Sequence, residues 1–168
     1  MKFSECKPGR IFVLCLENGD IVHEEVEQFA RDHSIAAASL IIIGGADKGS
    51  TLIVGPEQEN EIPITSLDYV LENVHEIAGA GTLFPDDQGN PVLHMHMACG
   101  RKSSTRTGCI RRGVRVWHVM EVVLFELLES NGRRVVNPET GFTLLKRECD
   151  VPQVKVSVFR CQVSALQS

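Results

Sequence analysis

The feature that most constrains this fold is a series of short apolar runs, rich in β-branched residues and separated by Gly, Pro, Asn and Asp. Runs of this length suit strands, whereas amphipathic helices need longer segments with a 3.6-residue period. Strands therefore outnumber helices, and we predict an α+β domain: a mixed, mostly antiparallel sheet packed by one or two helices. The predicted strands are residues 10–16, 37–43, 52–54, 74–78, 92–98, 114–128 and 154–158.

One helix is indicated between the first two runs. Asp20 is the expected N-cap, and the apolar residues that follow repeat at helical spacing up to His33. A strand, a helix and a second strand predict a right-handed crossover unit. The second run ends in Gly44-Gly45, for which a bulge or close backbone packing is favoured over a phosphate-binding turn.

Length and charge exclude several classes of protein. A chain of 168 residues fits one domain with a substantial core. Its net charge of -5 argues against a surface built entirely for nucleic acid. We expect a cytoplasmic protein without membrane contact, because the chain shows neither a secretory signal nor an apolar run of about 18 residues. The 6 cysteines form no C-x-x-C pair, which predicts free thiols.

The most specific chemical pattern is the segment Leu93-His94-Met95-His96-Met97. Alternation along a strand places His94 and His96 on one face and the methionines on the other. Two imidazoles form half of a site for a divalent metal such as zinc, and His118 is the expected third ligand if its strand lies beside this one. The alternative is that these histidines are ordinary core or interface residues, each with a hydrogen-bond partner.

A second pattern is a basic segment without acidic residues between Asp87 and Glu121. It indicates a locally positive face that binds an anion or DNA phosphates. The alternative is a solvated loop with ordinary surface charge. The candidate residues are Arg101, Lys102, Arg106, Arg111, Arg112 and Arg115.

The order of these pieces resembles the plant and prokaryote conserved (PPC) domain, also called DUF296. The resemblance runs from residue 10 to about residue 145, within a single domain assigned to residues 1–168 (core about 9–145, C-terminal extension about 151–168). The matching segments include Gly9-Arg10-Ile11-Phe12-Val13-Leu14, Ile43-Gly44-Gly45-Ala46, Gly89-Asn90-Pro91-Val92-Leu93-His94-Met95-His96 and Glu139-Thr140-Gly141-Phe142.

The resemblance implies a homotrimer and a metal site in which a Gly-Gly-His segment supplies the third histidine. This chain has Gly108-Cys109-Ile110 there, so Ile110 occupies the usual ligand position. His118 is the expected substitute, with the thiolate of Cys109 as the alternative. Plant members join the domain to an AT-hook, an Arg-Gly-Arg element that this sequence lacks.

Two functions follow as hypotheses. The first is a non-enzymatic, metal-containing homotrimer with a DNA-binding or regulatory role. The second is a zinc-dependent enzyme of the hydrolase or lyase type that acts on a small anionic substrate. No catalytic residue is assigned, because alternation places Glu121, the nearest candidate base, on the face opposite His118.

Overall fold

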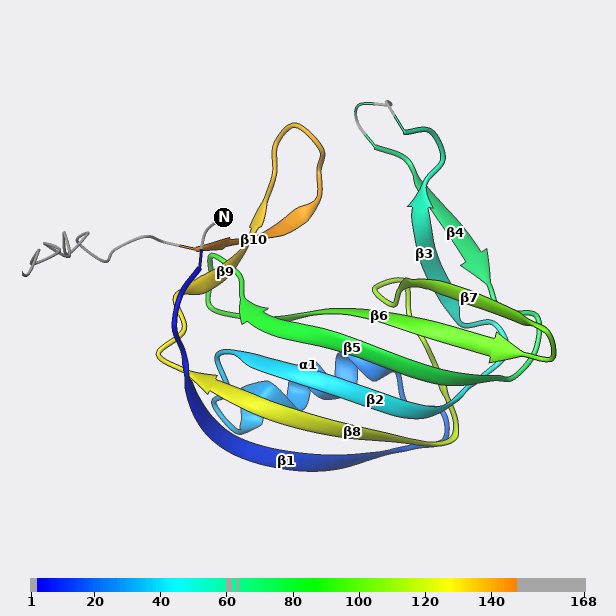
Figure 1. The fold of residues 1–168 in the computed structure, drawn as a ribbon, viewed down its shortest axis with the longest axis horizontal. Helices are drawn as coiled ribbons and strands as arrows, with labels where there is room; N and C mark the ends of the chain where they lie inside the picture. The colour runs from blue at the N-terminus through cyan, green and yellow to red at the C-terminus, as the bar shows by residue number, and fades with distance from the viewer. Residues whose placement is uncertain (1–2, 60–61, 63, 148–168) are drawn as a thin grey trace, which may run out of the picture.

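The fold is a long antiparallel sheet with one helix across one of its faces (Figure 1). The computed structural model describes residues 3–59, 62 and 64–147. The strands of the larger sheet lie in the order β1-β8-β2-β5-β6-β7-β3-β4, and β9 pairs with β10. The elements are β1 (Lys7–Glu17), α1 (Val22–Asp32), β2 (Ala38–Ala46), β3 (Thr51–Pro56), β4 (Ser66–Val70), β5 (His75–Pro85), β6 (Pro91–Arg101), β7 (Ser104–Cys109), β8 (Val116–Leu128), β9 (Gly132–Val136) and β10 (Thr143–Arg147).

The mostly antiparallel sheet is confirmed, and α1 is the one helix among the described residues. The strand-helix-strand unit is also present, with one difference: β8 lies between β1 and β2 and pairs antiparallel with both. Within the described segments, no helix is long and apolar enough to cross a membrane. The predicted strand at 154–158 lies outside the described residues.

The helix-facing side of the sheet carries the core. Leu40, Ile42 and Leu124 alternate along their strands and are fully buried with the apolar residues of α1. Met95 and Met97 belong to the same core. The predicted separation of these methionines from the histidines is therefore confirmed.

The other side of the sheet carries an apolar surface that the described residues do not cover. Cross-strand pairs place Ile11 opposite Phe125, and both Val13 and Ile41 opposite Val123. Val13 keeps 75% of its surface exposed. We call this surface the outer apolar face; it consists of Ile11, Val13, Ile41, Ile43, Val123 and Phe125.

Gly44 and Gly45 lie at the predicted bulge, in which β8 rather than β2 carries the extra residues. The register of β2 against β8 shifts between these two residues. Gly44 has a φ of +138°, and a Cβ there would lie 2.8 Å from the Cα of Met120, so both conformation and close approach require glycine. The bulge bends β8 beside His118, which itself has a φ of 59°.

The start of the helix differs from the prediction. Its N-cap is Ile21, without a side-chain hydrogen bond. The carboxylate of Asp20 instead accepts a hydrogen bond from the backbone N–H of Glu17 at 2.8 Å and so closes the turn after β1. Strands β4, β7, β9 and β10 were not predicted, because their sequences are short and polar.

A buried carboxylate fastens β1 to β8. Glu126 is 7% exposed and accepts hydrogen bonds from the backbone N–H, Nε and Nη2 of Arg10 at 2.7–2.9 Å. Arg10 also donates to the carbonyl of His33 at the end of α1. The hydrogen bonds from the Arg10 side chain and backbone lower the pKa of Glu126 to about 2.

The Glu126–Arg10 pair predicts a specific dependence of stability on pH. The folded pKa lies below the ordinary value of 4.5, so the pair stabilises the fold above about pH 4.5 and loses its effect as pH falls towards 2. We expect Glu126→Gln to lower the thermal midpoint at pH 7, with a difference from wild type that shrinks below pH 4. Glu129→Gln, in the exposed pair with Lys7, is the control and should change little. A pH-independent deficit of Glu126→Gln would contradict this role.

Candidate metal centre

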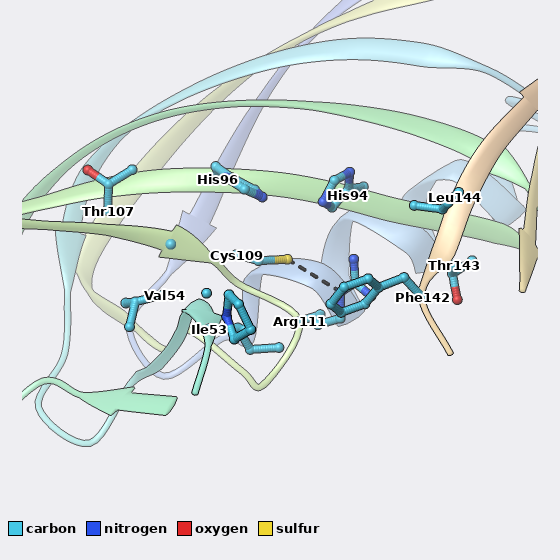
Figure 2. Close-up of a pocket in the computed structure, with 13 residues that line it drawn as sticks. Ile53, Val54, His94, His96, Thr107, Cys109, Arg111, Phe142, Thr143 and Leu144 are labelled. Atoms are coloured by element: carbon cyan, nitrogen blue, oxygen red, sulfur yellow. Dashed lines mark hydrogen bonds between the residues drawn. The ribbon is translucent and has the colours of Figure 1, made fainter. Parts of the chain in front are cut away.

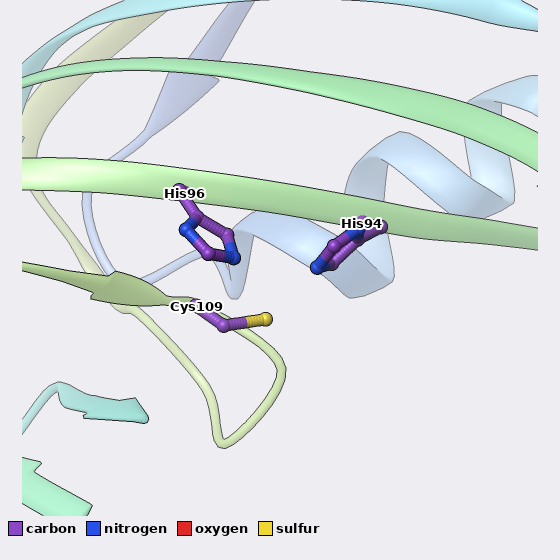
Figure 3. A group of neighbouring side chains, drawn as sticks. All are labelled: His94, His96 and Cys109. Carbon is purple, nitrogen blue, oxygen red and sulfur yellow. The ribbon is translucent and has the colours of Figure 1, made fainter. Parts of the chain in front are cut away.

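Strand β6 places two histidines on the sheet face opposite the helix. It pairs with β5 on one side and with β7 on the other, so its alternation is fixed along its whole length. His96 lies directly opposite Cys109 of β7, and His94 lies opposite Thr82 of β5. Directly paired residues share a sheet face. The register therefore brings two imidazoles and a thiol together (Figure 3).

These three side chains form a group that can hold a metal ion. The nearest ligand atoms of His94, His96 and Cys109 all lie within 4.8 Å of one another. Tetrahedral zinc, with bonds of about 2.0–2.3 Å, needs ligand atoms about 3.3–3.8 Å apart, so small side-chain rotations close the site. Two nitrogens and one sulfur leave the fourth position open, as in catalytic rather than structural zinc sites.

The surroundings of His94 keep its imidazole in the form that binds metals. Burial lowers the pKa of His94 to about 4, with further contributions from the positive charges of Arg134 and Arg111 and from His96. His94 is therefore neutral at physiological pH. On the third residue, the Sγ of Cys109 accepts a hydrogen bond from the Nε of Arg111 at 3.4 Å. A positive charge thus lies beside the sulfur. In contrast, burial raises the pKa of Cys99 to about 11, which makes that thiol inert.

A cavity of about 450 Å³ opens beside the three residues (Figure 2). Strand β3 supplies one apolar wall through Ile53 and Val54, and the segment leading into β10 supplies another through Phe142 and Leu144. Arg111 lines the cavity as well. A metal in this group would therefore face a space large enough for a small molecule.

The structure does not bring His118 to this group. The expected third ligand lies on β8, and strands β2 and β5 separate β8 from β6. The bulge also breaks the alternation of β8, so His118 is exposed while Val116 and Met120 are buried. Its backbone N–H donates to the Oδ1 of Asn18, and its ring packs against Trp117. Cys109, the alternative third ligand, lies beside His94 and His96 instead. Ile110 is a buried core residue.

The six basic residues do not form a single loop, because β7 runs through the segment. Arg101 and Lys102 lie at the β6–β7 turn, and Arg111 and Arg112 follow the other end of β7. Arg112 has an acidic partner, Asp68 of β4, at 3.2 Å. Arg106 lies over the ring of Tyr69, and Arg115 donates to the carbonyl of Gly19.

Arg134 is a charged residue of this region that the sequence analysis missed. It lies on β9, far along the chain from the histidines, and its side chain is buried against β5. The positive charge of Arg134 lies close to His94, because its Nη2 donates a hydrogen bond to Thr82 and Thr82 pairs with His94. No local pattern marks Arg134, because β9 was not predicted.

The four cysteines within the described residues are free thiols, as predicted. They are Cys6, Cys15, Cys99 and Cys109. Cys149 and Cys161 lie outside the described residues.

Sequence comparison identifies the family. The profile of the Plants and Prokaryotes Conserved (PCC) domain matches residues 3–128, and the chain belongs to this family. A curated relative is the bifunctional protein GlmU of Synechococcus sp. (strain JA-3-3Ab), which is 29% identical over 141 residues. The match covers 83% of this chain but 21% of that relative, so the chain spans about a fifth of its length.

Solved structures share the fold. A metal-containing protein from Archaeoglobus fulgidus gives a TM-score of 0.75 at 23% identity, covering 88% of this chain and 100% of that one. A plant- and prokaryote-conserved (PPC) protein from Pyrococcus horikoshii gives 0.75 at 21% identity, with coverage of 88% and 99%. A Ralstonia eutropha protein, whose name describes it provisionally as DNA-binding, gives 0.63 at 22% identity, with coverage of 81% and 90%.

The metal group predicts how single substitutions affect zinc content. His94→Ala, His96→Ala and Cys109→Ser each remove one of the three candidate ligand atoms, so, if zinc is the metal, each should lower its content by about tenfold or more. His118→Ala is the matched control and should retain it. Elemental analysis of protein prepared without a metal-affinity tag measures the result. Full zinc in Cys109→Ser together with loss in His118→Ala would contradict the assignment.

Proposed function

We propose that this protein is a non-enzymatic, metal-containing homotrimer with a regulatory role, in which the metal centre forms one wall of a ligand cavity. The observation that carries the proposal is the convergence of His94, His96 and Cys109 beside a cavity of about 450 Å³. Membership of the PCC family and a related fold in a protein described as metal-containing support it.

The donor set favours a particular class of metal. Imidazole nitrogen and thiolate sulfur suit zinc and related transition metals, whereas Mg²⁺ and Ca²⁺ require oxygen ligands. We therefore propose zinc, held by His94, His96 and Cys109. A bound zinc ion would supply a Lewis-acidic centre with one position open to a ligand from the cavity.

The enzymatic alternative is supported by the same cavity and open position. The enzymatic alternative also needs a side chain that transfers a proton. Among the described residues, the cavity lining contains no carboxylate, and its histidines are the two proposed metal ligands. A zinc-dependent hydrolase or lyase needs a base within reach of the bound water or the substrate. We therefore propose ligand binding, rather than catalysis, as the function of the site.

The outer apolar face supports the homotrimer. An apolar patch of this kind on three adjacent strands is typical of an interface between subunits. Ile41 pairs with Ala80, and Ala80 pairs with His96, so the face and the metal centre lie on the same side of the sheet. Association through this face would place the metal centres of neighbouring subunits on the covered side of each sheet.

Substitutions on this face test self-association. Val13→Lys leaves an isolated chain almost unchanged, because Val13 is 75% exposed, but it would place a charge in a subunit interface. We expect light scattering to give three times the chain mass of 18.5 kDa for the wild type and a smaller species for Val13→Lys. Val70→Lys, at a position on β4 that is 54% exposed, is the control and should remain trimeric. A monomeric wild type would contradict the proposal.

A DNA-associated role would depend on the β6–β7 turn. Arg101 and Lys102 line shallow surface hollows there, and threefold repetition would give three such points on the trimer. Glu72 and Glu76 line the same hollows and weaken their positive potential. We therefore propose that any DNA affinity comes from phosphate contacts alone and is independent of sequence.

The DNA role has a direct test in a salt series. The logarithm of affinity should fall with the logarithm of salt concentration by a slope of roughly -0.9 per phosphate neutralised. A variant with both Arg101→Gln and Lys102→Gln should show a shallower slope, whereas Arg31→Gln on α1 should match the wild type. Absence of any gel shift at low salt would remove DNA from the proposal.

A further inference from the structure

The metal centre is accompanied by a buried cation, Arg134, that has no negative partner among the described residues. Arg134 is 5% exposed. Its Nη2 donates to the hydroxyl of Thr82 at 2.6 Å and to the Thr82 carbonyl at 3.3 Å, and its Nε has no hydrogen-bond partner. A buried guanidinium is costly unless an anion compensates it. The ion pairs of the described residues involve other groups: Lys7 with Glu129, Arg10 with Glu126, and Arg112 with Asp68.

A second arginine, Arg111, lies beside the metal group and has hydrogen-bond donors that are not used. Arg111 lines the cavity and uses its Nε for the hydrogen bond to Cys109. In the described part of the chain, its two Nη groups form no hydrogen bond or ion pair. A guanidinium in this position can bind a carboxylate or phosphoryl group through two parallel hydrogen bonds.

The charges of the region do not balance. Burial lowers the pKa of Arg134, and the positive charge of Arg111 lowers it further, whereas Cys109 acts in the opposite direction. A divalent metal would add further positive charge to this region. The cavity is therefore an electropositive space, and a bound anion would relieve both the repulsion between the arginines and the excess charge at the metal.

We propose that the cavity binds a small organic anion, with its acidic head between Arg111 and the metal centre and a short apolar tail against Ile53, Val54, Phe142 and Leu144. The acidic head is a carboxylate or a phosphoryl group. The position of the metal beside the head rests on the proposed function, whereas the arginines and the cavity support anion binding independently. A space of about 450 Å³ suits a small molecule rather than a peptide or a nucleic acid.

A homologous series of carboxylates tests the tail and the head separately. Acetate, butanoate and hexanoate are titrated into the full-length protein by calorimetry, with hexan-1-ol as the neutral analogue. Each methylene buried against the apolar walls should tighten affinity by about fourfold. Hexanol should bind at least about tenfold more weakly than hexanoate, because it cannot pair with a guanidinium. Hexylphosphonate distinguishes the phosphoryl head from the carboxylate head, since the tighter of the two identifies the natural class.

Matched arginine variants locate the head group. Arg111→Gln should weaken hexanoate binding by about tenfold or more, the loss expected for a charge-assisted hydrogen bond. Arg112→Gln changes the same charge one residue away, outside the cavity lining, and should leave the affinity within about twofold of wild type. Arg111 is exposed, so its removal does not threaten the fold.

The two proposals fail in different ways. If the protein holds no zinc while Arg111→Gln still weakens hexanoate binding, the metal centre is refuted and the anion site stands. If zinc is present, but hexanoate binds no more tightly than acetate or hexanol, or Arg111→Gln binds it as the wild type does, the anion site is refuted. Titrations with and without prior treatment with a chelator separate these results.

Discussion

The pairing of β6 with both β5 and β7 is the constraint on which the rest of the site depends. A slip of one residue in this register would turn Met95 and Met97 outward and His94 and His96 into the core. The methionines oppose such a slip because they are fully buried beneath α1, together with Leu93. The hydrogen bond from the backbone N–H of Leu93 to the carboxylate of Glu27 also joins the helix to this strand. Core packing on one face therefore holds the proposed metal ligands in place on the other.

The same register determines which residues can act together. Thr82, His94, His96 and Cys109 lie side by side across three strands, and Arg134 reaches this row from β9 by its bond to Thr82. The outer apolar face begins next to this row, because its residue Ile41 pairs with Ala80 of β5. One side of the sheet thus combines a candidate subunit interface, a candidate metal centre and an electropositive cavity.

Sequence patterns predicted the parts of this arrangement that depend on local alternation. The H-x-H pair, the apolar strands and the bulge at Gly44-Gly45 all follow from spacing within a few residues. The third residue of the metal site depends on strand order, which spacing along the sequence does not define. Sequence patterns favour His118, but β2 and β5 separate its strand from β6. The bulge adds to this difference between sequence and structure, because alternation no longer holds where one strand carries extra residues. Arg134 could not be found, since only the tertiary fold brings β9 to β5.

We propose that Cys109, rather than His118, completes the metal site with His94 and His96. Cobalt(II) in place of zinc tests it most directly, because a thiolate bound to cobalt gives an intense near-ultraviolet charge-transfer band that imidazole ligands do not give. We expect this band in the wild type and in His118→Ala, and its loss in Cys109→Ser. A cobalt-loaded wild type without the band, or a Cys109→Ser protein that keeps it, would contradict the claim.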